Sequence, residues 1–122
     1  MSKGILMRTA GVLAILVALV HGISAEFRLF PTVTAGSPAH LMLLRMVWQA
    51  STLSWATLGV LLFVAPSMGD RAARWIGGAA LVNFAAGSLG GLFATGWQHY
   101  GWMLLATLCA LVVFALPKRV PH

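Results

Sequence analysis

The sequence is poor in charged residues, and acidic residues are the scarcest. Of its 122 residues only 8% are charged and only two are acidic, whereas 60% are hydrophobic. A soluble domain of this length normally carries charge on about a quarter of its residues. The composition therefore excludes an ordinary water-soluble globular fold and indicates a protein of the lipid bilayer.

Cysteine is almost absent as well, because Cys109 is the only one in the chain. A single cysteine cannot form an intramolecular disulfide and says nothing about the redox compartment. We interpret it as a small buried apolar residue. Length is the other restriction, since one membrane-spanning helix takes about 20 apolar residues. The chain has no room for an additional soluble domain or for a nucleotide-binding fold.

The apolar residues form four stretches, which predict an all-α integral membrane four-helix bundle built from two hairpins. We expect one transmembrane domain over residues 1–122, with spans at about 5–25, 38–65, 71–95 and 98–116. Ser37 and Pro38 should open the second span, because serine caps helices and proline fits the first helical position. The first span also resembles a signal peptide, but Ile23 is not the small residue that cleavage requires.

Basic residues are distributed unevenly around the four stretches. The N-terminus, the second loop and the C-terminus carry the pairs Lys3 and Arg8, Arg71 and Arg74, and Lys118 and Arg119. The first loop has only Arg28 and the third has none, so the positive-inside rule predicts a multi-pass protein with both termini in the cytoplasm. The net charge of +6 then reflects topology and anionic lipid, and we expect no nucleic-acid partner.

Arg45 lies inside the second apolar stretch, where a charge costs about 2.5–3.5 kcal/mol at mid-bilayer. Gln49 and Thr52 follow at i+4 and i+7, on the same helix face, and Trp48 flanks them. Glu26 is the candidate counter-ion, since the other acidic residue is predicted on the opposite side of the membrane. Alternatively, Arg45 extends towards the aqueous interface and Glu26 is a solvated loop residue.

Histidines offer a second hypothesis for the same outer end. His21, His40 and His99 are all predicted near the outer face, and two neutral imidazoles on facing helices, His21 and His99 above all, could ligate haem iron. No histidine pair has i, i+4 ligand spacing and no CxxCH motif is present, so no metal site is assigned. The alternative is that these are interfacial histidines, hydrogen-bonded to loops or lipid head groups.

Small residues dominate the third stretch. Gly87 and Gly91 form a GxxxG pair, and Asn83 lies one turn earlier on the same face. Small residues let membrane helices approach closely, and asparagine often hydrogen-bonds across such interfaces. We therefore expect these residues to serve helix packing, with the third span at the centre of the bundle or at a dimer face.

The stretch from His21 through Gln49, with H-G-I-S-A-E-F followed by L-R-M-V-W-Q-A-S-T, resembles a group of small four-helix bacterial inner-membrane proteins. That group has a histidine before a Gly-Glu pair and then L-R-x-x-W-H. The resemblance implies architecture only, since no function is established for the group. Our own expectation is a small four-helix protein of the bacterial inner membrane. Two departures are Ala25 in place of glycine and Gln49 in place of histidine.

Small multidrug exporters are similar in length and span number, but their mid-span glutamate is missing here, because Glu26 lies at the end of the first span.

Three functions remain open. The first is a non-enzymatic accessory subunit of a larger membrane complex or homo-oligomer, which predicts an apolar, small-residue surface unused by internal packing. The second is an outward-facing module that binds or transports a quinone, lipid or anion, which predicts a cavity lined by Arg45, Gln49, Trp48 and Glu26. The third is a haem protein. We do not expect an enzyme, because no nucleophile–base pair or metal-ligand cluster is recognisable.

Overall fold

The computed structural model describes residues 2–34, 36–95 and 100–118. Within these ranges the chain is helical, without strands, and forms four α-helices. They are α1 (Lys3–Ser24), α2 (Pro38–Val64), α3 (Asp70–Thr95) and α4 (Gly101–Ala115). The fold class is therefore all-α, as the sequence predicts.

Local residues explain where several helices begin and end. The Ser2 hydroxyl accepts a hydrogen bond from the Ile5 amide at the start of α1. The Ser37 hydroxyl likewise accepts one from the His40 amide, and Pro38 is the first residue of α2, so the predicted opening of this helix is confirmed. Between α2 and α3 the chain turns at Gly69, whose φ of 90° favours glycine.

The segment after α1 differs from the expected loop at residues 26–37. The chain instead continues as a π-helical turn, Ala25–Leu29, and a 3-10 turn, Phe30–Thr32. The helical run from Lys3 therefore reaches Thr32, and it carries Glu26 on helix rather than on loop.

Three helical stretches are long and apolar enough to cross a membrane: Lys3–Thr32, Pro38–Met68 and Asp70–Thr95. The fourth helix is apolar but has only 15 residues. At 1.5 Å per residue it is about 22 Å long, less than the roughly 30 Å of a bilayer core. Each expected apolar stretch contains a helix, but α4 is shorter than the span predicted at 98–116.

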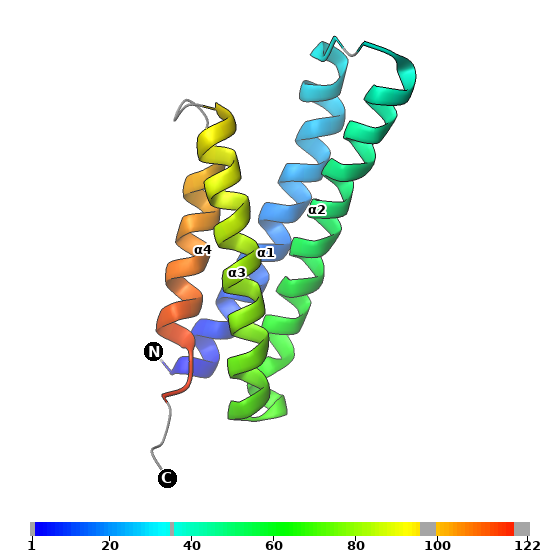
Figure 1. Ribbon diagram of the computed structural model, residues 1–122. Helices are drawn as coiled ribbons and strands as arrows, with labels where there is room; N and C mark the ends of the chain where they lie inside the picture. The colour runs from blue at the N-terminus through cyan, green and yellow to red at the C-terminus, as the bar shows by residue number, and fades with distance from the viewer. Residues whose placement is uncertain (1, 35, 96–99, 119–122) are drawn as a thin grey trace.

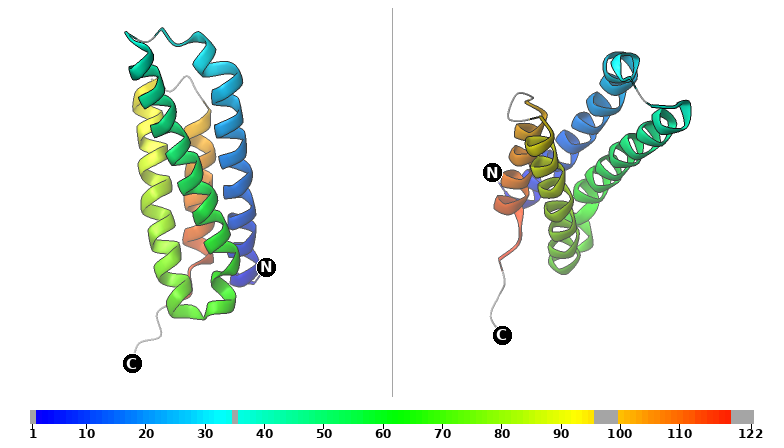
Figure 2. Two further views of the ribbon diagram at one scale, coloured as in Figure 1. Left: turned by 90° about the vertical axis from the view of Figure 1, so that its right-hand side faces the viewer. Right: turned by 45° about the horizontal axis from the view of Figure 1, so that its top comes forward.

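The helices form two hairpins, α1–α2 and α3–α4, that pack together at one end (Figure 1). Towards the other end the hairpins diverge, as Figure 1 and the right-hand view of Figure 2 both show. The N-terminus, the α2–α3 turn and the end of α4 lie at the packed end. The α1–α2 connection lies at the divergent end, which we call the outer end because of the predicted orientation.

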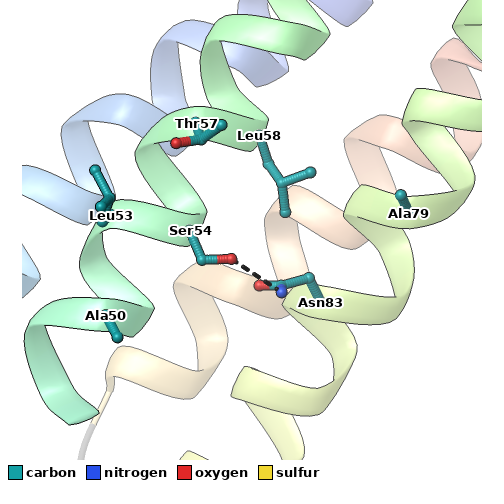
Figure 3. A pocket seen from close by; sticks show the side chains of 7 residues that line it. All are labelled: Ala50, Leu53, Ser54, Thr57, Leu58, Ala79 and Asn83. Carbon is teal, nitrogen blue, oxygen red and sulfur yellow. Dashed lines mark hydrogen bonds between the residues drawn. The ribbon is translucent and has the colours of Figure 1, made fainter.

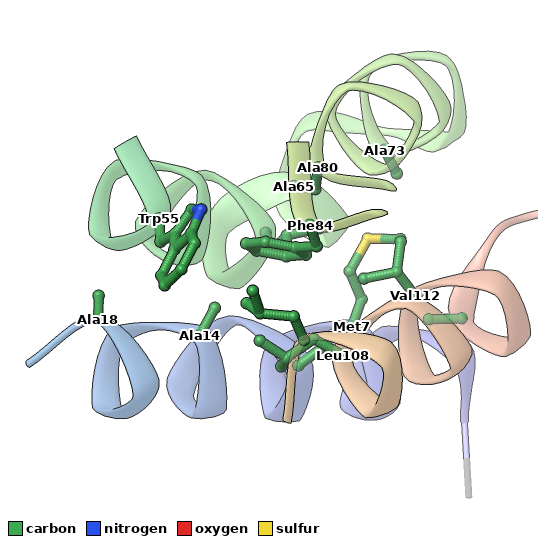
Figure 4. Packing of buried hydrophobic residues seen from close by; sticks show 14 residues of the cluster. Met7, Ala14, Ala18, Trp55, Ala65, Ala73, Ala80, Phe84, Leu108 and Val112 are labelled. Atoms are coloured by element: carbon green, nitrogen blue, oxygen red, sulfur yellow. The ribbon is translucent and has the colours of Figure 1, made fainter. Parts of the chain in front are cut away.

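The core combines alanines of α1 with large apolar residues and further alanines of the other helices (Figure 4). Ala10, Ala14 and Ala18 are fully buried along one face of α1. They pack with Trp55 and Leu62 of α2, Ala80 and Phe84 of α3, and Leu105, Leu108 and Val112 of α4. The small face of α1 thus lets its neighbours approach closely.

The tightest helix contact joins α1 and α2 through two glycines. A Cβ added at Gly11 would lie 2.6 Å from the Gly59 carbonyl oxygen, and one added at Gly59 would lie 2.8 Å from the Gly11 carbonyl oxygen. Of the two places expected for the third span, the centre of the bundle is not the one observed, because α1 and α2 form the most extensive interface; the dimer face stays a prediction. Helix α3 packs mainly on α4 and leaves one face exposed.

Candidate functional site: the outer polar cluster

An ion pair joins α2 to the π-helical turn that follows α1. The Arg45 Nε atom lies 3.2 Å from Glu26 Oε2, and the two side chains are 48% and 37% exposed. The Arg45 guanidinium also lies over the Phe30 ring, 5.1 Å from its centroid. The structure thus contains the ion pair that the sequence predicts, braced on one side by an aromatic ring.

Gln49 connects this ion pair to the backbone of α1. Its Nε2 donates to Glu26 Oε1 at 2.9 Å and, at 3.4 Å, to the carbonyl oxygen of Gly22. Gly22 permits this approach, because an added Cβ would lie 2.8 Å from Thr52 Cγ2 and 3.1 Å from Gln49 Oε1. The Glu26 carboxylate is therefore held by a cation on one oxygen and an amide on the other.

His21 lies between two tryptophans of α2. Its ring is stacked on Trp48, with ring centroids 4.4 Å apart and an interplanar angle of 3°. The Trp55 ring is tilted against it, with centroids 4.5 Å apart and an interplanar angle of 50°. The His21 Nε2 atom lies 3.3 Å from the Ser51 hydroxyl oxygen. The Trp48 indole N–H donates to the His21 carbonyl oxygen at 3.3 Å. Both faces of the imidazole are thus covered by indoles.

The polar residues that the sequence places at the outer end of α2 come together against α1. Arg45, Gln49 and Thr52 face the α1 side of the hairpin, and the Thr52 hydroxyl donates to the Trp48 carbonyl of its own helix. We call Glu26, Arg45, Gln49, Trp48 and His21 the outer polar cluster. Its members bond to one another, so the cluster fastens the ends of α1 and α2.

His99 lies outside the described residues, as do its neighbours 96–98. His40 is exposed at the start of α2, and the ring of His21 is engaged by Trp48, Trp55 and Ser51. Within the described ranges no group of three or more histidine, cysteine or acidic side chains is placed to hold a metal ion. To ligate iron through Nε2, His21 would have to give up its contact with the Ser51 hydroxyl, and the haem alternative stays a prediction.

A hollow of about 470 Å³ lies between α2 and α3, at mid-depth (Figure 3). Asn83 Nδ2 donates to the Ser54 hydroxyl at 3.1 Å and bridges the two helices there. The remaining lining residues are Ala50, Leu53, Thr57, Leu58 and Ala79. The hollow shares no residue with the outer polar cluster.

The other two predicted packing residues of α3 also lie against neighbours. A Cβ at Gly87 would lie 2.9 Å from both Leu105 Cδ1 and Trp55 Cζ2. At Gly91 an added Cβ would lie 3.5 Å from Trp102 Cβ, an ordinary contact distance. A Cβ at Gly87 therefore requires these side chains to shift, whereas Gly91 has room for a Cβ.

One edge of α3 carries exposed small residues, the first of which, Ala79, also lines the hollow towards α2. Ala79, Ala86, Gly90 and Ala94 are exposed, and their spacing of seven, four and four residues puts them on one helix face. We call these four residues the small-residue stripe. No heavy atom lies within 4 Å of a Cβ added at Gly90. The buried face of α3 instead carries Ala73, Gly77, Ala80, Phe84 and Ser88.

Several residues of these sites were not anticipated from the sequence. Ser51 contacts His21, Phe30 lies beneath Arg45, and Ser54 is the partner of Asn83. Ser51 had a usable signal, because it lies beside Thr52 and one turn after Trp48. Ser54 had a weaker one, because it lies nine residues after Arg45, on the opposite face of α2. Phe30 had none, since only the unexpected helical turn after Ala25 brings its ring towards α2.

Comparison with known proteins supplies no further constraint. No protein-family model, no curated protein and no solved structure matches the chain.

Proposed function

We propose that the chain is a non-enzymatic accessory subunit that packs against a transmembrane helix of a larger membrane complex. The proposal includes four membrane spans, with both termini in the cytoplasm of a bacterial inner membrane. The distribution of basic residues supports this topology. Five described basic residues lie together at the packed end, which the positive-inside rule assigns to the cytoplasm: Lys3, Arg8, Arg71, Arg74 and Lys118.

The small-residue stripe of α3 is the observation that carries the proposal. In lipid, helix association is driven by van der Waals packing and interhelical hydrogen bonds, and small residues let backbones approach. Bulky side chains at Val82, Leu89 and Phe93, which are 73%, 54% and 82% exposed, suit the lipid side of the same helix. The stripe beside them offers lipid little side-chain surface, but it offers a partner helix a close contact.

The contacts of the outer polar cluster support the competing binding or transport function less well. That function requires a cavity lined by Arg45, Gln49, Trp48 and Glu26. These side chains are bonded to one another or to α1, and the hollow between α2 and α3 is lined by other residues. The cluster is thus better suited to holding the hairpin closed.

The test is gentle purification from the native membrane, followed by mass spectrometry and an optical spectrum. Gly90→Leu fills the stripe, and Gly78→Leu is its matched control, because an added Cβ meets no atom within 4 Å at either glycine. We expect the wild type and Gly78→Leu to co-purify with one subunit in a fixed ratio, and Gly90→Leu to lose it.

Co-purification that survives Gly90→Leu, or the absence of any subunit in a fixed ratio, would contradict the proposal. A second copy of the chain as the partner would make the protein a homo-oligomer instead. A Soret band would favour the haem alternative.

A further inference from the structure

A second hollow, of about 530 Å³, lies at the packed end of the bundle. It is bounded by the start of α1, the turn before α3, the first turn of α3 and the segment after α4. Its lining residues are Lys3, Gly4, Met7, Pro66, Asp70, Ala73, Ala115, Pro117 and Lys118. It is separate from both the outer polar cluster and the small-residue stripe.

The hollow combines apolar walls with two ammonium groups. Met7, Ala73 and Ala115 are buried along its walls, whereas Lys3 and Lys118 supply positive charge. Lys3 Nζ donates a hydrogen bond to the Leu116 carbonyl and so joins the start of α1 to the end of α4. Lys118 is exposed and makes no hydrogen bond or ion pair with any other described residue.

The one acidic residue here does not cancel this charge. Asp70 lies in the first turn of α3, where the positive end of the helix dipole stabilises a carboxylate. Arg71 and Arg74 follow it in the same helix. Arg8 of α1 lies near this end too, with its guanidinium 5.7 Å from the Phe63 ring centroid. Counting formal charges, the two lysines outnumber Asp70 in the lining, and the surrounding arginines add to the positive potential.

We propose that this hollow binds the phosphate of an anionic phospholipid from the cytoplasmic leaflet. Basic pockets between membrane helices on the cytoplasmic side are suited to such head groups. Lys118 and Lys3 contact the phosphate, and the apolar walls accommodate the glycerol and the first acyl carbons. The site rests on the proposed membrane insertion but not on the accessory role.

The test is native mass spectrometry of the purified full chain, titrated separately with phosphatidylglycerol and phosphatidylethanolamine that carry the same acyl chains. We expect one phosphatidylglycerol to bind more tightly than phosphatidylethanolamine. Lys118→Gln should weaken this binding about fivefold, as expected for one lysine near an anionic lipid. Arg28→Gln is the matched control, since it removes the same charge from an exposed residue at the outer end, and it should leave binding unchanged.

Equal binding of the two lipids, or a Lys118→Gln variant that binds phosphatidylglycerol like the wild type, would overturn the proposal. Displacement of the lipid by millimolar inorganic phosphate would assign the hollow to a soluble phosphate instead. Lys3→Gln also breaks the bond to the Leu116 carbonyl, so its circular dichroism is compared with that of the wild type. A folded Lys3→Gln chain with weakened lipid binding would support the site. These results are independent of the co-purification experiment, which uses variants of α3.

Discussion

At the scale of single residues, the closest approach in the bundle depends on two glycines that face each other across α1 and α2. The distances at Gly11 and Gly59 leave no room for even one methyl group, because a backbone carbonyl oxygen of the facing glycine lies within 2.8 Å of each added Cβ. Backbone cannot move aside as a flexible side chain can. Any larger residue must therefore separate the two helices of the first hairpin.

Gly11→Ala should consequently destabilise the protein by about 1–3 kcal/mol, the usual range for overpacking a close contact. The measurement is unfolding by a denaturing detergent, followed by circular dichroism. Gly78→Ala is the control, since the added methyl meets no atom within 4 Å and alanine favours helix more than glycine. A Gly11→Ala protein as stable as the control would contradict the observed helix separation.

The Glu26–Arg45 ion pair yields a second prediction at this scale. Both side chains are partly exposed, so we expect a modest coupling free energy of about 0.5–1 kcal/mol, near the upper end for surface pairs. Glu26→Gln, Arg45→Met and the double variant form the cycle, measured by thermal unfolding in detergent. Strictly additive single effects would show that the two charges do not stabilise each other.

Sequence reasoning succeeded at Arg45 and missed the glycine crossing for physical reasons. The chain has only two acidic residues, so a cation in the outer half of the second apolar stretch had a single nearby candidate partner. By contrast, the chain has 13 glycines, and spacing along one helix does not show which glycine faces another helix. Gly11 and Gly59 become distinguishable only when the crossing of α1 and α2 is known.

At the scale of elements, the start of α2 was predictable and the end of α1 was not. Ser37 and Pro38 are local signals whose effect does not depend on tertiary structure. Polar and turn-forming residues suggested a loop from Glu26, yet the chain remains helical to Thr32. Contacts of Glu26 and Phe30 with α2 accompany this helical continuation, and no local pattern reports them.

Ser37→Ala should therefore loosen the first turn of α2, because the Ser37 hydroxyl accepts a hydrogen bond from the His40 amide. Loss of such a cap costs about 1 kcal/mol. Hydrogen exchange should show faster exchange of the His40 amide and of the first turn of α2. Ser67→Ala is the comparison, since the Ser67 hydroxyl donates a hydrogen bond to the Val64 carbonyl oxygen at the end of α2 and not to the start of a helix. Unchanged exchange at His40 would show that Pro38 alone determines where the helix begins.

At the scale of the whole molecule, the two ends of the bundle differ in chemistry. The outer end holds the polar cluster that fastens α1 to α2, and the packed end holds the lysine-lined hollow. The sequence predicts this polarity from the positions of its basic residues. It predicts small residues along the third span, but neither the divergence of the hairpins nor which residues of α3 form the small-residue stripe, because both depend on which helix faces are used in packing.

Cysteine labelling tests this arrangement most directly, since both proposals depend on the orientation of the helices in the membrane. In a Cys109→Ala background, Thr34→Cys places a thiol in the α1–α2 connection and Met68→Cys places one beside the α2–α3 turn; both positions are exposed. We expect a membrane-impermeant maleimide to label Thr34→Cys in spheroplasts with an intact inner membrane. Met68→Cys should be labelled only after that membrane is permeabilised. Labelling of Met68→Cys from outside, or of both sites from the same side, would contradict the account.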